Sequence, residues 1–148
     1  MGLDNVIYLK LHNKLDLDDW EIMPEYADIE FDEYITNSYG DGYYYTVCYW
    51  RKCWGLRADI LSILNIDPNS MSDDEEDDGR YDIDTDEQII QIRDVLISYL
   101  EHPDDWFSQI WTMKEMIPHI AQDIVNLSWL LNFRKEHKQN NIIFVDSY

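Results

Sequence analysis

The stretch CYWRKCWGLR at residues 48–57 gathers side chains that suit nucleotide binding. It brings three of the eleven basic residues of an acidic chain together with two tryptophans. An indole stacks on a base, and a guanidinium binds a phosphate through two parallel hydrogen bonds. Helical spacing would place Trp50, Trp54 and Arg57 along one side of a helix. The candidate ligand-binding residues are therefore Trp50, Arg51, Trp54 and Arg57; the structural alternative is that the tryptophans are core and the cations pair with acids.

The stretch SDDEEDDGRYDIDTDE at residues 72–87 places ten carboxylates against one arginine. A solvated loop, a calcium loop and an imitation of nucleic-acid phosphates would each tolerate this charge. An extended chain advances about 3.4 Å per residue, close to the ~3.4 Å between phosphates along a DNA strand. Consecutive carboxylates therefore fit a basic groove that holds a nucleic-acid backbone. The candidate partner-binding residues are Asp73, Asp74, Glu75, Glu76, Asp77, Asp78, Asp82 and Asp84.

Calcium-binding and catalytic patterns are weak. A calcium loop that begins at Asp74 has Thr85 at position 12, where a bidentate Glu is expected. Glu115, His119 and Asp123 are spaced by four residues and could bind a metal on a helix, but Pro118 interrupts that helix. The sequence has no CxxC pair, HExxH, GxSxG or phosphate-cradling glycine loop. We therefore expect no enzyme activity, no catalytic residue, no cofactor and no metal.

The charge balance limits the class of partner. The formal net charge is −20, from 31 acidic and 11 basic residues. Such a field repels nucleic acid and anionic membranes and favours a basic protein partner. No apolar run is long enough for a membrane span, and the first residues lack the order of a signal peptide, so we expect a cytoplasmic protein. With 45% hydrophobic residues, the 148 residues should fold as a single domain.

Hydrophobic patterns predict the elements that carry these residues. VIYLKL at residues 6–11 and NIIFV at residues 141–145 read as strands that pair near the two ends of the chain. From about Tyr45, periodic apolar residues predict a helix that ends before Pro68. Cys48 and Cys53 would then lie on different faces of that helix as free thiols. Residues 67–84 are expected to form an acidic loop, and residues 30–45 fit either a hairpin or an irregular loop.

The second half of the sequence predicts more helices. Thr85 and Gln88 form a capping box that starts a helix with Ile89, Ile92, Leu96 and Tyr99 on its buried face. Pro103 suits the first turn of a third helix, and Pro118 must kink that helix or begin a fourth. The predicted class is α+β, with three to four helices packed on a small sheet that pairs the N- and C-terminal strands.

The opening MGLDNVIYLK, the stretch CYWRKCWGLR and the closing FVDSY resemble a loose group of small, uncharacterised proteins that bacteriophages often encode. Those proteins begin Met-Gly-Leu-Asp and carry a Tyr-Trp-Arg-Lys stretch. The resemblance covers about a quarter of the chain, and its motifs name no reaction. It points to Gly2, Leu3, Asp4, Tyr49, Trp50, Arg51 and Lys52 and implies a phage setting.

Three functions remain open on the sequence. The leading one is an acidic phage-type inhibitor that covers a basic, nucleic-acid-binding surface of a host protein, for example as an anti-CRISPR protein that imitates nucleic acid. The second is a protein that binds or sequesters a nucleotide-like molecule through the tryptophan and arginine side chains. The third is a structural or assembly protein whose acidic surface provides solubility.

Overall fold

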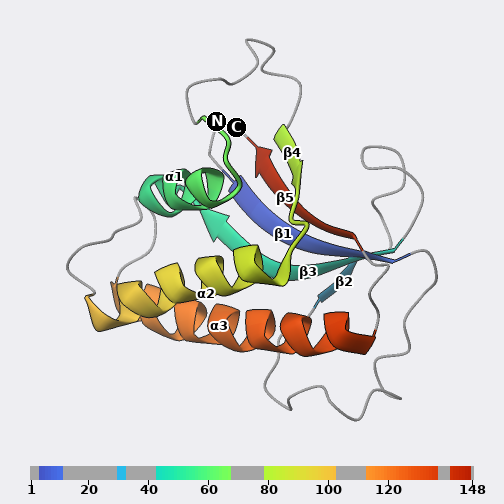
Figure 1. The fold of residues 1–148 in the computed structure, drawn as a ribbon. Helices are drawn as coiled ribbons and strands as arrows, with labels where there is room; N and C mark the ends of the chain where they lie inside the picture. The colour runs from blue at the N-terminus through green and yellow to red at the C-terminus, as the bar shows by residue number, and fades with distance from the viewer. Residues whose placement is uncertain are drawn as a thin grey trace.

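The described part of the chain forms an α+β fold of two layers, in which three helices lie on one side of an antiparallel sheet (Figure 1). The computed structural model describes residues 4–11, 30–32, 43–67, 79–102, 113–136 and 141–147. In these ranges, the sheet has five strands in the order β2-β3-β1-β5-β4. The strands are β1 (Asp4–Leu11), β2 (Glu30–Asp32), β3 (Tyr43–Arg51), β4 (Gly79–Asp82) and β5 (Asn141–Ser147); the helices are α1 (Trp54–Ile63), α2 (Asp86–Glu101) and α3 (Met113–Glu136).

The predicted pairing of the terminal strands is confirmed. β1 lies at the centre of the sheet, antiparallel to β5 on one side and to β3 on the other. Alternate residues of β1, β3 and β5 turn one apolar face toward the helices. The buried residues on this face pack with helix residues in a continuous core that includes Ile7, Leu9, Cys48, Trp50, Ile142, Phe144, Leu56, Ile60, Ile89, Ile92, Leu96, Leu127 and Leu130.

The expected helix from Tyr45 is wrong over its first part, because residues 43–51 form β3 and the helix begins at Trp54. Tyr, Thr, Val and Trp dominate β3, and these β-branched and aromatic side chains suit a half-buried strand. Lys52 has a φ of 54°, a left-handed conformation that interrupts both strand and helix. Cys48 therefore lies on β3 and Cys53 just before α1, and both are free thiols as expected.

The acidic loop expected over residues 67–84 is wrong at its end, because Gly79–Asp82 forms β4 and pairs with β5. The backbone N–H of Ile83 donates to Ile142 O at 2.8 Å and extends this pairing. Apolar burial explains the strand, since Ile83 is buried and Tyr81 packs against the core, while Arg80 and Asp82 point to solvent. Residues 68–78, including Asp73–Asp78, lie outside the described residues.

The helices that follow agree with local sequence signals. Thr85 and Gln88 form the predicted capping box at the start of α2, with Ile89, Ile92 and Leu96 buried and Tyr99 half-buried. Pro118 lies inside α3, which continues through it. The helix expected from Pro103 falls outside the described residues. Residues 30–45 were expected to form either a hairpin or an irregular loop. The two ends of this segment do pair as antiparallel strands, since β2 pairs with residues 44–46 of β3.

Candidate functional site

The candidate ligand-binding residues do not share one helix face. Trp50 is fully buried on β3, and Arg51 beside it is exposed, with Nε 3.6 Å from Asp4 Oδ1. Trp54 opens α1 and is 45% exposed, while Arg57 one turn later is 6% exposed. The structure brings Trp54 and Arg57 together, with the guanidinium carbon 5.9 Å from the indole centroid. The single helical platform of four side chains is therefore wrong.

Arg57 is held in a buried polar cluster by β1 and β5. Its Nε donates to both carboxylate oxygens of Asp146, at 2.9 and 3.0 Å. Asn5 Nδ2 donates to Asp146 Oδ1 at 2.7 Å. Asn5 and Asp146 are 1% and 0% exposed, so this ion pair is desolvated. The ion pair between Arg57 and Asp146 links α1 to β5, and Asn5 links Asp146 to β1. The role of Arg57 is therefore structural.

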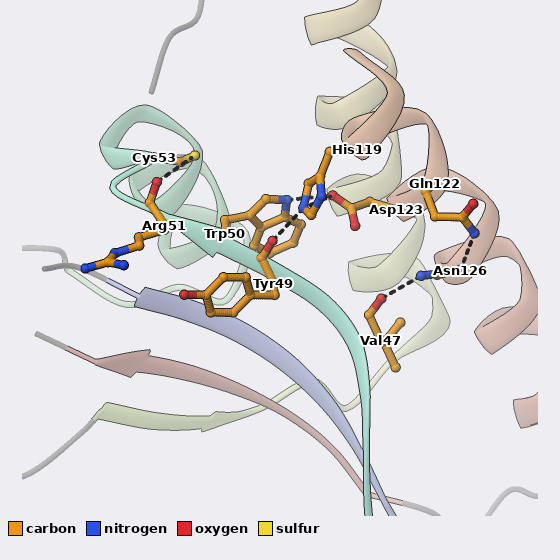
Figure 2. A network of polar contacts seen from close by, with 9 residues as sticks. All are labelled: Val47, Tyr49, Trp50, Arg51, Cys53, His119, Gln122, Asp123 and Asn126. Carbon is orange, nitrogen blue, oxygen red and sulfur yellow. Dashed lines mark hydrogen bonds and ion pairs between the residues drawn. The ribbon is translucent and has the colours of Figure 1, made fainter. Parts of the chain in front are cut away.

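A second polar cluster joins α3 to backbone carbonyls of β3 (Figure 2). The register between β1 and β3 pairs Ile7 with Cys48 and Tyr8 with Thr46, so Val47 is an extra residue in a β-bulge. Asn126 Nδ2 donates to Val47 O at 2.9 Å, and His119 Nε2 donates to Tyr49 O at 2.7 Å. Side chains of α3 thus satisfy strand carbonyls beyond the residues that β2 covers.

Asp123 lies between these two contacts. The indole Nε1 of Trp50 donates to Asp123 Oδ2 at 2.7 Å, and His119 Nε2 lies 3.6 Å from the same oxygen. His119, Asp123 and Asn126 follow one another at spacings of four and three, which places them on one face of α3. All three turn toward β3 in Figure 2. Asp123 is the most deeply buried charged group of this cluster, at 3% exposure.

A cavity of about 400 Å³ opens beside this cluster. Its size falls at the lower end of the range for small-molecule sites. Its walls mix apolar, aromatic and polar side chains from three elements. The lining residues are Val6 and Tyr8 of β1, Thr46, Val47, Cys48 and Tyr49 of β3, and His119, Gln122, Asp123 and Asn126 of α3.

Burial sets the protonation of the two acidic groups in this cavity. Desolvation raises the pKa of Asp123 well above its usual value, although hydrogen bonds from Trp50 and Cys48 partly oppose the shift. Burial also raises the pKa of the Cys48 thiol, and the nearby Asp123 carboxylate adds to that effect. A nucleophilic cysteine requires a stabilised thiolate. Cys48, His119 and Asp123 are residue types that cysteine hydrolases use. The raised pKa of Cys48, however, disfavours the thiolate that a nucleophilic cysteine needs.

The metal site considered from Glu115, His119 and Asp123 gains no support. His119 and Asp123 do approach each other, but the side chain of Glu115 is outside the described set. Among the described residues, no group of three His, Cys, Asp or Glu side chains is arranged to hold a metal ion.

The two described acidic candidates lie at the opposite edge of the sheet. Asp82 and Asp84 are exposed at alternate positions of the extended chain that leads from β4 into α2. Asp86 and Glu87 follow in the first turn of α2 and are also exposed. We call Asp82, Asp84, Asp86 and Glu87 the acidic edge.

Arg134 of α3 fixes the acidic edge in place. Its Nη2 donates to Asp84 O at 3.0 Å, and its Nε lies 3.2 Å from Asp86 Oδ1. The Gln88 side chain accepts from the backbone N–H groups of Asp84 and Thr85. Hydrogen bonds thus fix the backbone that bears the carboxylates of the acidic edge.

Sequence reasoning missed most of the buried polar contacts. Asp146 occupies an inward position of β5, two residues after the buried Phe144. An acid at a core-facing strand position is a signal for a buried cation, and it was available in the alternation of NIIFVDS. The stripe of His119, Asp123 and Asn126 was visible as helical spacing. Its partners on β3 were hidden, because that segment was predicted to be helical.

Comparisons with known proteins add no relative. The chain matches no protein-family model, no curated protein and no solved structure. In the ranges that the structure describes, no helix has the length and apolar character needed to cross a membrane.

Proposed function

We propose that this protein is an acidic phage-type inhibitor that binds a basic, nucleic-acid-binding surface of a host protein in the host cytoplasm. A defence factor such as a CRISPR effector is one partner of this kind. The observation that carries the proposal is a net charge of −20 on a folded chain whose acidic edge is hydrogen-bonded in place. The protein would act by binding and not by catalysis.

The geometry of the acidic edge supports imitation of a phosphate backbone. Residues two apart in an extended chain project to the same side about 6.8 Å apart. Asp82 and Asp84 have this relationship, with the buried Ile83 between them. Two steps along a DNA strand advance a similar distance, since phosphates rise about 3.4 Å each. Asp73–Asp78 precede β4 directly in the sequence and would extend the same run of charge.

The rigidity of the acidic edge supports affinity. A segment whose backbone is already ordered loses less conformational entropy on binding than a mobile one. Arg134, Gln88 and the pairing of β4 with β5 order the backbone at Asp84 before any partner arrives. Long-range attraction between the acidic chain and a basic partner would also speed association at low ionic strength.

The test captures partners from a bacterial lysate on the immobilised protein. We expect a basic nucleic-acid-binding protein to be retained at low salt, released at raised salt and displaced by added duplex DNA. A D82N/D84N variant should retain less of it. A D94N/E101Q variant removes the same charge from exposed positions of α2 and is the matched control.

Two results would contradict the proposal. Equal retention by both variants and by a variant with Asp73–Asp78 changed to Asn or Gln would remove the acidic stretch from the interface. Retention of no basic protein at low salt would favour the structural or assembly role.

A further inference from the structure

We propose that the cavity between α3 and the bulge of β3 binds a small organic cation, a guanidinium or an alkylammonium, with Asp123 as its counter-charge. This inference is independent of the proposed function. The cavity lies at the β3 edge, whereas the acidic edge lies beside β4 at the other side of the sheet.

The first step is the position of Asp123. The carboxyl group lines the cavity although it is only 3% exposed, so a cation bound beside it would stabilise its ionised form in largely desolvated surroundings. Electrostatic attraction is much stronger in such surroundings than in water. The direct attraction between a cation in the cavity and an ionised Asp123 is therefore stronger than the attraction to an exposed carboxylate such as Asp94.

The second step is the set of partners that Asp123 has. Its short hydrogen bond comes from the neutral indole of Trp50, at 2.7 Å, and the neutral thiol of Cys48 donates a second one. Within the described ranges, the basic side chain that pairs with it is His119, at 3.6 Å. The Nε2 hydrogen of that imidazole is directed to Tyr49 O, at 2.7 Å (Figure 2). Among the described residues, the basic group that faces Asp123 is thus a histidine whose shorter contact is with Tyr49 O.

The third step is the cost of this arrangement. A buried carboxyl group without a well-placed cation destabilises a fold when it ionises. An asparagine at position 123 would accept the same hydrogen bond from Trp50 without that cost. Charged groups that a fold keeps at such a cost, in a cavity, are candidates for ligand binding.

The fourth step is the character of the remaining walls. Tyr8 and Tyr49 are among the lining residues, and the ring faces of tyrosine attract cations. Gln122 and Thr46 add neutral polar groups. The net charge of −20 further concentrates cations and repels anions. The cavity is therefore suited to a cation with an apolar stem.

The test titrates the ¹⁵N-labelled protein with n-butylguanidinium chloride and follows the indole N–H signal of Trp50, which reports directly on Asp123. The uncharged n-butylurea has nearly the same shape and is the matched ligand. The salt is about 0.15 M, where the Debye length is about 8 Å and weak surface association is screened. We expect a saturable shift with the cation and none with the urea.

Variants locate the charge. D123N should weaken binding of n-butylguanidinium at least tenfold, because it removes the counter-charge and keeps an acceptor for Trp50. D94N removes one exposed charge from α2 and should bind like the parent. Equal binding by D123N and the parent, or an equal response to the cation and the urea, would overturn the proposal. The comparison of the two ligands on the parent protein decides the matter even if D123N does not fold.

A second arm identifies the source of the cation. A capped Gly-Arg-Gly peptide is added in competition with n-butylguanidinium. Displacement would mean that the cavity takes an arginine side chain of another protein. Binding of the small cation without displacement by the peptide would mean that the cavity takes a free molecule.

Discussion

The indole of Trp50 and the carboxylate of Asp123 are 73 residues apart in sequence and form a 2.7 Å hydrogen bond within the core. This bond joins the middle of α3 to the end of β3. It also gives a buried acid its shortest contact. The two residues therefore connect the stability of the fold with the chemistry of the cavity.

Asp123→Asn should change how stability depends on pH. The pKa of Asp123 is raised in the folded state by desolvation, so the folded protein binds this proton more tightly than the unfolded chain. The resulting stabilisation is complete below the unfolded value of 3.8 and is lost as the pH rises through the folded value. Relative to the parent, D123N should gain stability as the pH rises above about 4. Urea unfolding of both proteins at a series of pH values measures this difference, and a difference that is constant with pH would contradict it.

Trp50→Ala and Trp54→Ala should have very different costs. Trp50 is 0% exposed, so its truncation leaves a large cavity and should reduce the free energy of unfolding by about 3–5 kcal/mol. Trp54 is 45% exposed, and its loss should cost about 1 kcal/mol or less. Thermal or chemical unfolding compares the two variants. Similar melting of W50A and the parent would show that Trp50 is not part of the core.

Arg57→Met should be strongly destabilising. It leaves Asp146 buried without its cation and should cost about 3–5 kcal/mol. Arg51→Met removes an exposed pair with Asp4 and should cost under about 1 kcal/mol. A double variant with Asp146→Asn should recover part of the loss, because the uncompensated charge is gone. If R57M and R51M unfold at the same denaturant concentration, the buried pair contributes no more than the exposed one.

Cys48 and Cys53 should resist alkylation in the folded protein. Both are buried, and the pKa of Cys48 is raised by burial and by Asp123, which disfavours the reactive thiolate. Iodoacetamide should modify Cys48 about a hundredfold or more slowly than in concentrated guanidinium chloride. Mass spectrometry after timed quenching gives the rates. Rapid modification of Cys48 under native conditions, or an intramolecular disulfide in freshly purified protein, would be inconsistent with this structure.

Local signals predicted local structure well. Thr85 and Gln88 lie three residues apart, so their capping box can be read from the sequence and marks the start of α2. The apolar residues of β1 and β5 likewise predicted strands, and the sheet pairs them. The helical spacing of Leu56 and Ile60 was real, but it was extended too far toward the N-terminus.

Contacts that depend on tertiary register could not be predicted. The bulge at Val47 exists because β3 pairs with β1 in a particular register, and only then does Val47 O meet Asn126. The pair of Arg57 and Asp146 joins residues 89 apart in sequence. Because residues 45–51 were predicted to be helical, neither the bulge nor the cavity beside it could be predicted.

The position of β5 in the sheet has a consequence for how the chain folds. Asn5 and Asp146 meet across a sequence separation of 141 residues, and β5 stands between β1 and β4. Neither neighbour can complete its pairing until the last described strand has been synthesised. Sheets dominated by such distant pairings fold slowly, because a long loop must close before the contacts stabilise it. A nascent chain would therefore leave the β5-side edge of β1 unpaired until residues 141–147 have been synthesised, and its high negative charge would oppose association of that edge with other chains during that interval.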